Sequence, residues 1–546
     1  MVKPALTDFP GDDDLALASV LGKRLARAGD RPFLLTPGRS YSLAELDARA
    51  TRLAHGLAGL GVKRGETLLV MLPNCVGFIE IWWALAKLGI IQVPVNTAYR
   101  GSILRHLVND SSAATMILAP EFLERLAEIA DEVPGVTRLL LAGEGSVPAK
   151  LAAGREVLAL ERLYVEPRGA LPPGPSERDL MAVMYTSGTT GPSKGVMVTH
   201  AHAYHYALAG VDLMGLTPED VYYAPLPLFH IAGQWNVTYA CLIAGARVGL
   251  PFPFKAERFW EEVAAYRATT TFLLGAMASL LSRQPPSPKD AETPMAKALI
   301  VPQLPEAAEF ERRFALKATT TYGSTEANVP VKAHFDLPNP RVCGRARDEL
   351  YELRIVDEFD NEVPAGKAGE LCVRAKRPWI LMAGYWNHPE WTAQAWRNLW
   401  LHTGDSLMRD AAGNYHFVDR LKDAIRRKGE NISSMEVELE ILQHPAVLEA
   451  AVFPVPAEGG EDEVMAVVVA KPGERLEPEA LIGFLAPRLP HFMVPRYLEF
   501  ADALPKTPTG KIQKYPLRER GTGPATWDRE RAGIRLKDLV QKERTA

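Results

Sequence analysis

Between residues 42 and 94, apolar positions alternate between two kinds of spacing. They first recur every three or four residues, as on an amphipathic helix, and then form unbroken runs typical of buried strands. The pattern predicts a helix from Ser42, a strand over 67–72, a helix over 77–88 and a strand over 90–94. Alternation of this kind predicts βαβ units around a parallel sheet. The apolar positions of the first helix are Leu43, Leu46, Ala50, Leu53 and Leu57.

The same alternation returns in the middle of the chain. It predicts helices over 256–266 and 306–314, and strands over 269–274 and 318–321. A second group of parallel strands is therefore expected there.

Beyond residue 350 the pattern changes twice. Residues 350–373 predict strands joined by turns, because Gly, Pro and Asn interrupt the apolar positions. After Arg420 a smaller α+β pattern begins behind the polar stretch 419–423. We therefore expect an α/β protein: a large N-terminal domain (1–420) with mostly parallel sheets and a β subdomain, and a small α+β C-terminal domain (421–546). The predicted C-terminal elements are a helix over 434–442, strands over 450–455 and 464–470, and a helix over 478–489.

Composition and charge narrow the function classes. A net charge of −4 over 546 residues indicates no nucleic-acid partner. The four cysteines are scattered without a C-x-x-C pair, which favours reduced thiols in a cytosolic protein. The acidic N-terminus lacks a signal-peptide pattern, and the apolar stretch 78–95 carries Glu80 and Lys87 and is too short to span a bilayer. We expect a soluble, cytoplasmic protein.

The run at residues 185–196 has the residue types of a phosphate-binding loop. It follows a predicted strand over 180–184, and its glycines allow close backbone approach to a ligand. It is not the common P-loop, which requires GxxxxGK[ST], since Lys194 precedes Gly195. A solvated polar loop is the alternative for the run taken alone. Its hydroxyl side chains and glycines are Ser187, Thr189, Thr190 and Ser193, and Gly188, Gly191 and Gly195.

The run resembles the phosphate-loop signature of the adenylate-forming superfamily, which comprises acyl- and aryl-CoA synthetases, nonribosomal peptide adenylation domains and beetle luciferases. Further motifs of that superfamily follow in its order, and the resemblance extends from about residue 38 to residue 516. The matching motifs are PLPLFHIAG (225–233), TYGSTE (321–326), WLHTGD (400–405), VDRLKDAIRRKGEN (418–431) and LPKTPTGK (504–511).

The resemblance implies an acyl-CoA synthetase-like fold with a mobile C-terminal domain, and an ATP-dependent acid:CoA ligase. In that reaction a carboxylate and ATP give acyl-AMP and pyrophosphate, and CoA then displaces AMP to give acyl-CoA. ATP, Mg²⁺ and coenzyme A are the implied co-substrates and cofactor. Because the first step concentrates negative charge on the α-phosphate, positioning and electrostatic stabilisation carry the catalysis.

Matching residues carry the implied roles in binding ATP. Tyr322 would stack on adenine beside Gly323, Asp405 would accept the ribose hydroxyls, and Arg420 would contact ribose or phosphate. For Asp405 the alternative is a buried carboxylate that accepts backbone amides. The implied ATP-binding set is Thr186, Ser187, Gly188, Thr189, Thr190, Lys194, Tyr322, Gly323, Thr325, Asp405 and Arg420.

The implied catalytic residues are Lys511, His230, Thr325 and Glu326. Lys511 would reach the α-phosphate and the carboxylate as a point charge, Thr325 would donate to the α-phosphate, and Glu326 would bind Mg²⁺. The alternatives are a solvated lysine in a basic tail for Lys511, a surface glutamate for Glu326 and a core histidine for His230. Whether His230 acts as a base or orients the acid stays open.

The stretch at 418–431 matches the hinge motif. Lys422 occupies the hinge position, about which the C-terminal domain would rotate after adenylation. Arg426, Lys428 and Gly429 would then border the CoA tunnel, and the alternative for this basic run is a solvated helix end.

One stretch departs from the superfamily pattern. Residues 299–305 contain none of the glycines of the usual turn that contacts adenine. Carnitine/crotonobetaine-CoA and bile-acid CoA ligases also lack that turn, and the chain resembles them more weakly around residues 259–270 and 284–287.

The residues expected to line the acid pocket are Gly233, Gln234, Trp235, Phe272, Gly275 and Asn328. Trp235 with Tyr239 could form an aromatic cage for a quaternary ammonium group. The same side chains would equally border an acyl chain, a sterol side chain or an aryl ring, so the acid stays open.

Three other functions compete with the ligase. They are an adenylating enzyme that loads a carrier protein, a luciferase-type oxygenase and a catalytically silent nucleotide- or acyl-binding homologue. Residues 225–240 contain no acidic side chain to bind an α-amine, which disfavours amino-acid activation. The expected partners are a small carboxylic acid, ATP and CoA, with no nucleic acid and no membrane span, and a homodimer is an alternative to the monomer.

Overall fold

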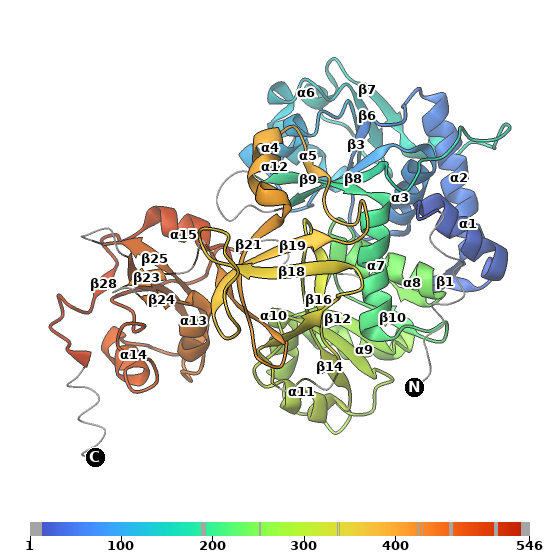
Figure 1. The fold of residues 1–546 in the computed structure, drawn as a ribbon. Helices are drawn as coiled ribbons and strands as arrows, with labels where there is room; N and C mark the ends of the chain where they lie inside the picture. The colour runs from blue at the N-terminus through green and yellow to red at the C-terminus, as the bar shows by residue number, and fades with distance from the viewer. Residues whose placement is uncertain are drawn as a thin grey trace.

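The computed structural model describes two groups of elements, which Figure 1 shows side by side. The N-terminal elements build three large sheets, and the elements after residue 425 lie together at one side, in orange and red. The described residues are 14–186, 193–250, 253–335, 337, 339–421, 423, 425–427, 430–457, 462–506 and 512–536.

The first sheet has eight strands, and its centre is parallel. The strand at 67–71 is buried at every position, as a strand covered by helices on both faces requires. In spatial order the strands are β20 (Gly384–Tyr385), β9 (Lys194–Thr199), β8 (Leu180–Thr186), β4 (Ile91–Pro94), β3 (Thr67–Met71), β5 (Thr115–Leu118), β6 (Arg138–Leu141) and β7 (Glu156–Ala159).

Local sequence explains where the helices of this sheet begin and end. Helix α2 (Leu43–Gly59) starts where the Ser42 side chain accepts a hydrogen bond from the Glu45 N–H, and α3 (Val76–Leu88) ends at Gly89 in the left-handed conformation. The other helices before residue 200 are α1 (Leu17–Ala28), α4 (Gly101–Asp110), α5 (Leu123–Glu128) and α6 (Ala149–Ala152).

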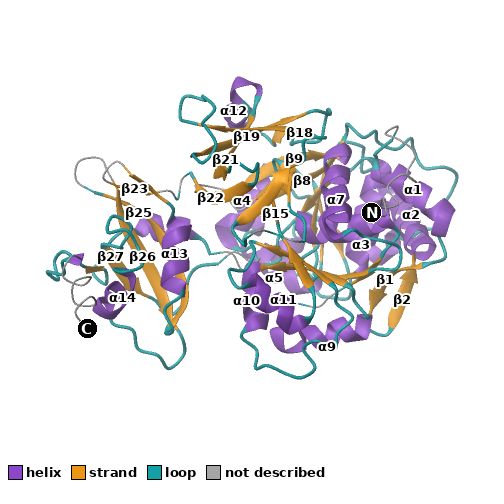
Figure 2. Cartoon of the chain, turned by 60° about the horizontal axis from the view of Figure 1, so that its bottom comes forward, coloured by secondary structure: helices purple, strands orange, loops and turns teal. Residues whose placement is uncertain are grey.

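The second sheet has seven strands and is parallel except for its edge strand β2. Figure 2 shows α9 (Ala256–Tyr266), α10 (Gly275–Ser282) and α11 (Ala307–Phe314) beside it. Its strands are β14 (Lys317–Thr319), β13 (Lys297–Val301), β12 (Thr270–Leu274), β10 (Val221–Tyr223), β11 (Arg247–Gly249), β1 (Pro32–Thr36) and β2 (Arg39–Ser42).

The third sheet is the predicted β subdomain, and it is larger than the sequence indicated. The predicted strands within 350–373 form one edge strand and its neighbour, while the rest come from segments before and after them. Helix α12 (Pro389–Ala395) lies between two of its strands in sequence. The strands are β15 (Thr321–Ser324), β16 (Asn328–Lys332), β17 (Val342–Ala346), β22 (Tyr415–Arg420), β21 (Leu401–Arg409), β19 (Ala368–Ala375) and β18 (Tyr351–Val356).

Helix α7 (His200–Met214) is buried along nearly its whole length and packs on two further helices. One is α8 (Ala240–Ala244) and the other is the π-helix η5 (Ala232–Tyr239), which sequence periodicity did not predict. Figure 1 shows α7 and α8 near the middle of the N-terminal part.

The C-terminal elements form an α+β unit with their own apolar clusters, drawn from residues 425–536, whereas the N-terminal clusters end at residue 417. The predicted helix over 478–489 is shorter than expected, and the other predicted C-terminal elements agree within a few residues. These elements are β23 (Ile425–Arg427), β24 (Glu430–Ile432), α13 (Ser434–Leu442), β25 (Val447–Pro456), β26 (Asp462–Ala470), α14 (Pro478–Leu485), β27 (Tyr497–Phe500), α15 (Lys514–Arg520) and β28 (Trp527–Asp528).

The fold class expected from sequence is therefore confirmed: mixed α/β with large N-terminal sheets, a β subdomain and a small C-terminal α+β unit. Within the described residues, no helix combines the length and apolarity needed to cross a bilayer.

Candidate active site

Three predicted residues from the third sheet meet at one place. Asp405 on β21 lies opposite Arg420 on β22, and its Oδ1 is 3.8 Å from the Arg420 Nε. The Tyr322 hydroxyl, from β15, donates to Asp405 Oδ2 at 2.7 Å, and the Tyr322 ring stacks near Phe417. Burial and the Asp405 carboxylate raise the pKa of Tyr322 well above its ordinary value, so the hydroxyl stays a donor. An aromatic ring, a carboxylate and a guanidinium thus converge at one place.

A buried carboxylate that the sequence analysis missed supports this aspartate. Glu370 Oε1 accepts from the Gly404 N–H at 2.9 Å, and its Oε2 contacts His402 Nδ1 and Arg397, both at 2.8 Å. Cys372 lies against His402, and burial, with Glu370 beside it, raises the pKa of this thiol to about 12. The cluster is internally paired and fixes the irregular part of β21 that presents Asp405. Glu370 follows a glycine at the start of β19, but nothing in its local sequence links it to a strand so much later in the chain.

Glu326 follows β15 and lies near the same aspartate. Burial raises the pKa of the Glu326 carboxyl, and the Asp405 carboxylate raises it further, while the Tyr385 hydroxyl, 3.3 Å from Oε1, opposes the rise. The Glu326 carboxylate offers the oxygen ligands that a hard divalent cation prefers. The residues present therefore fit Mg²⁺, with Glu326 as the ligand.

The turn between β15 and β16 brings backbone close to backbone. A Cβ at Gly323 would lie 2.5 Å from the carbonyl oxygen of Asn328, so no other residue fits there without movement. Thr325 is buried within the same turn. The two residues that sequence reasoning placed at adenine and at the α-phosphate thus belong to one tight turn.

Lys194 begins β9 and stands at the end of the predicted phosphate loop. Its ammonium lies 4.9 Å from the ring centre of Tyr385 and 5.1 Å from that of Trp391. The Thr186 hydroxyl donates to the Lys194 carbonyl at 3.5 Å. The other predicted residues of this loop lie outside the described residues: Ser187, Gly188, Thr189 and Thr190.

His230 is oriented by the backbone of the helix that follows it. Its Nδ1 accepts from the Ala232 N–H at 3.2 Å, and its carbonyl accepts from the Gln234 N–H at 3.0 Å. In a neutral imidazole this places the ring proton on Nε2. The side chain is only partly buried. The fixed tautomer makes Nε2 a hydrogen-bond donor.

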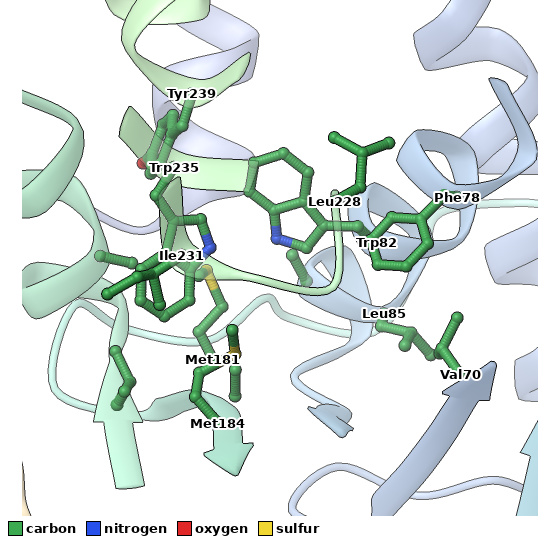
Figure 3. Close-up of a cluster of buried hydrophobic side chains, with 14 of the residues drawn as sticks. Val70, Phe78, Trp82, Leu85, Met181, Met184, Leu228, Ile231, Trp235 and Tyr239 are labelled. Carbon is green, nitrogen blue, oxygen red and sulfur yellow. The ribbon is translucent and has the colours of Figure 1, made fainter. Parts of the chain in front are cut away.

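Three residues predicted to line the acid pocket lie on η5 in the interior. A Cβ at Gly233 would come within 2.5 Å of the Pro227 carbonyl oxygen, and the amides of Gln234 and Gln92 meet at 2.7 Å. Trp235 is fully buried and lies edge-on to Tyr206. Figure 3 shows Trp235 near Met181 of β8 and near Ile231, the residue before η5.

The remaining pocket residues come from two other segments. Phe272 is buried near the end of β12, and a Cβ at Gly275 would lie 2.8 Å from the Pro302 carbonyl oxygen, in the stretch that lacks the family's glycines. The Asn328 amide donates to the carbonyls of His202 and Ile380 at 3.0 and 3.1 Å. Its side chain therefore ties α7 to the loop before β20.

The two aromatic rings considered for a cation cage are already packed against others. Tyr239 is fully buried and lies edge-on to Trp82 at 5.8 Å and to Tyr204 at 6.2 Å. Figure 3 shows Trp82, Trp235 and Tyr239 as members of one apolar cluster. This arrangement favours a hydrophobic environment around Trp235.

Several predicted residues lie outside what the structure describes: Lys511, Lys422, Lys428 and Gly429. Arg426 lies opposite Asn431 in the β23–β24 hairpin. Its side chain is not among those that the structure describes. The neighbouring Arg427 is buried and paired with Glu463 at 2.8 Å. At the predicted hinge, Asp419 Oδ2 accepts from both the N–H and the hydroxyl of Ser434 at 2.6 Å.

A cavity of about 640 Å³ lies elsewhere and shares no residue with the predicted sites. Arg64, Pro175, His205 and Trp379 are among its lining residues, so it borders the first turns of α7 and the loop before β20.

The family model "AMP-binding enzyme" matches residues 21–386, and "AMP-binding enzyme C-terminal domain" matches residues 436–511. The chain is 31% identical over 487 residues to the crotonobetaine/carnitine–CoA ligase of Escherichia coli O17:K52:H18 (strain UMN026 / ExPEC), covering 88% of this chain and 93% of that one.

Two solved structures show the same fold over nearly the whole chain. The anthranilate CoA ligase AuaEII in complex with anthranoyl-AMP superposes with a TM-score of 0.82 at 25% identity, covering 94% of this chain and 98% of that one. ATP-bound MatB from Rhodopseudomonas palustris gives a TM-score of 0.79 at 28% identity, and the match covers 93% of this chain and 99% of that one. The chain belongs to the AMP-binding enzyme family and is an AMP-forming acid:CoA ligase that uses ATP, Mg²⁺ and CoA.

Proposed function

We propose that Tyr322, Asp405 and Arg420 bind the adenosine half of ATP, while Glu326 and Lys194 act at its phosphates. The observation that carries this proposal is the 2.7 Å hydrogen bond by which Tyr322 and Asp405 meet, with Arg420 paired beside them. Asp405 would accept from the ribose hydroxyls, and the Tyr322 ring would stack on the base. The remaining residues of the phosphate loop, 187–190, complete this set.

The chemistry of the first step follows from charge. A carboxylate oxygen of the acid attacks the α-phosphorus, the bond to the bridging oxygen breaks, and pyrophosphate leaves. Lys194, Thr325 and Lys511 would stabilise the added negative charge by donating to phosphate oxygens. Mg²⁺ supplies charge neutralisation at the phosphates when bound. Glu326 must be ionised to hold that ion, which its raised pKa makes harder in acid.

His230 would orient the acid at the start of η5. Its Nε2 proton, fixed by the hydrogen bond at Nδ1, can be donated to the substrate carboxylate. A neutral donor at this position holds the carboxylate without withdrawing its charge.

The bound acid would have an apolar body, aryl or aliphatic. The supporting observations are the buried, ring-packed environment of Trp235 and Tyr239 and the absence of acidic side chains from residues 225–240. A quaternary ammonium group needs an open aromatic face or a carboxylate. Because the chain is similar to a crotonobetaine/carnitine–CoA ligase, a carnitine-like acid is the second candidate.

The thioester step would need the C-terminal unit, residues 421–546, to move relative to residues 1–420. Lys422 would be the pivot, and Arg426, Lys428 and Gly429 would border the CoA path. Separate apolar clusters on the two sides of residues 418–424 support this division. Lys511→Ala is expected to abolish adenylation while sparing thioester formation from pre-made acyl-AMP, and equal loss of both steps would contradict two conformations.

The oligomeric state and the cellular location of the protein stay predictions. Homodimer formation is testable by light scattering on a size-exclusion column, and a cytoplasmic location is expected because ATP and CoA are supplied there.

The test of the proposed function is pyrophosphate release with and without CoA. The panel contains medium-chain fatty acids, cinnamates, arylpropionates, bile acids, carnitine and crotonobetaine. We expect release with an aryl or aliphatic acid and faster turnover when CoA is present. Release with carnitine or crotonobetaine alone would overturn the apolar assignment and select the second candidate.

A further inference from the structure

The ammonium of Lys194 lies between two aromatic rings instead of beside an acid. Tyr385 and Trp391 are 4.9 and 5.1 Å from it, and their rings are mutually edge-on at 80°. Among the described residues, no carboxylate forms an ion pair with Lys194. Contacts of a cation with ring faces change an affinity by about two- to thirtyfold. The lysine of the phosphate loop is therefore held by rings in this structure.

Both rings are fixed by contacts of their own. Tyr385 lies on β20, opposite Val196 of β9, and its N–H donates to the Thr392 hydroxyl at 2.8 Å. His388 stacks on Trp391 with ring centres 3.6 Å apart, and its Nε2 is 3.1 Å from Asp110 Oδ1. The pairing of β20 with β9 carries Tyr385 alongside the strand that Lys194 begins.

Tyr385 also stands between two opposite charges. Its ring faces the Lys194 ammonium, while its hydroxyl donates to Glu326 Oε1 at 3.3 Å. A direct Lys194–Glu326 ion pair would neutralise the group that binds phosphate and the group that binds Mg²⁺ at the same time. The ring separates the two groups, and the hydroxyl supports the carboxylate.

We propose that Tyr385 and Trp391 are positioning residues for ATP, which hold the Lys194 ammonium at the phosphate loop and keep it from pairing with Glu326. This inference rests on the proposed roles of Lys194 and Glu326. The aromatic pair lets ATP engage a lysine that is already placed, without first breaking an ion pair. Tyr385 joins the two charged groups of the phosphate end into one unit.

The first test is a KM-against-kcat comparison in ATP-dependent pyrophosphate release. Trp391→Leu removes one ring, and we expect the KM for ATP to rise about fivefold with kcat within about twofold of the wild type. Trp391→Phe restores a ring face and should recover most of the loss. A wild-type KM in Trp391→Leu, or equal loss in Trp391→Phe, would overturn the proposal.

The second test separates the role of the Tyr385 ring from that of its hydroxyl. It does not depend on whether Trp391→Leu folds. Tyr385→Phe keeps the ring face and removes the donor to Glu326. It should raise the Mg²⁺ concentration for half-activation about threefold, because Glu326 loses one hydrogen bond. Tyr385→Leu should in addition raise the KM for ATP. If Tyr385→Phe leaves the Mg²⁺ response unchanged, Tyr385 does not support Glu326.

Two controls distinguish positioning from general destabilisation. Phe484→Leu removes a ring that lies 3.8 Å from Arg488 in the C-terminal unit, and it should leave the KM for ATP unchanged. In a Lys194→Met background, Trp391→Leu should have no further effect on that KM, because the cation is gone. An equal effect in both backgrounds would contradict the proposal. If wild-type enzyme shows no acid-dependent pyrophosphate release, the proposed function fails instead.

Discussion

The adenosine end and the acid end of the candidate site are built in different ways. At the adenosine end the predicted side chains pair with one another, as Tyr322 and Asp405 do at 2.7 Å. At the acid end they pair with core and backbone: Trp235 lies against Tyr206, and the Asn328 amide binds the His202 and Ile380 carbonyls. Under the proposed assignment, ATP would be bound by a fixed set of polar side chains, whereas the acid would be bound by an apolar interior whose shape selects it.

This contrast has a physical basis. Adenosine offers hydroxyls and a ring, for which hydrogen bonds of fixed geometry give both affinity and orientation. An apolar acid offers only surface, so discrimination depends on how closely the interior is packed. Perturbing the polar set should therefore change the KM for ATP, and perturbing η5 should change the KM for the acid.

The largest effect is expected from Asp405→Asn. The variant loses charge-assisted acceptance of the ribose hydroxyls and leaves Arg420 without its partner. We expect kcat/KM for ATP to fall about 100-fold, which corresponds to two such hydrogen bonds. Asp410→Asn is the matched control. Asp410 directly follows β21, the strand that carries Asp405, and its carboxylate contacts Asn414 and His416. An effect of Asp410→Asn on the KM for ATP as large as that of Asp405→Asn would place the effect in the sheet, not in the site.

At the acid end, Gly233→Ala should raise the KM for the acid about tenfold. The added methyl would come 2.5 Å from the Pro227 carbonyl oxygen, and overpacking of this kind moves η5 and His230. The KM for the acid should rise while that for ATP stays constant. Gly22→Ala, where a Cβ meets nothing within 4 Å, is the control and should behave as wild type. A rise in both KM values for Gly233→Ala would show that the two ends are not separate.

Tyr322→Phe should give a smaller change at the adenosine end. The ring remains for stacking, and only the hydroxyl that donates to Asp405 is removed. One hydrogen bond to a charged group is worth about 1.5 kcal/mol, so the KM for ATP should rise about tenfold. A loss as large as that of Asp405→Asn would mean that the hydroxyl, not the carboxylate, holds the ribose.

The smallest effect on activity comes from α7, whose histidines instead affect stability in acid. Burial lowers the pKa of His200 and of His202 to about 4, so both are neutral in the fold. Because the unfolded state takes up protons first, their contribution to stability is complete above about pH 6.5 and is lost as the pH falls towards 4. The melting temperature should fall between pH 7 and pH 5. His200→Asn, which can still accept from the Leu17 N–H, should weaken the fall of the melting temperature with pH. An unchanged fall in this variant would contradict a role for His200 in acid stability.

Sequence predicted the elements that carry strong periodicity and the residues that carry motifs. Periodicity predicts the helix at 434–442 and a strand over 67–72, which the structure has at 67–71, and the motifs assign Tyr322, Asp405 and Arg420 to one ligand, ATP. Apolar spacing and motif order are local properties, so both are readable from the chain.

Three features could not be predicted in this way. The π-helix η5 has no periodicity of its own, because it is buried on all sides. Glu370 and Tyr385 act through contacts with residues far away in the chain, on strands whose pairing no local pattern specifies. The degree to which Trp235 is enclosed depends on Tyr206 and on side chains from other helices and strands, which only the packed structure shows.

The most direct test of the account is one measurement made on two variants: the KM for ATP and the KM for the acid, from pyrophosphate release, in Asp405→Asn and in Gly233→Ala. The account predicts a crossed result, in which Asp405→Asn raises the KM for ATP alone and Gly233→Ala raises the KM for the acid alone. If each variant raises both constants to the same extent, the adenosine end and the acid end are one cooperative unit, and the separation argued from their contacts is wrong.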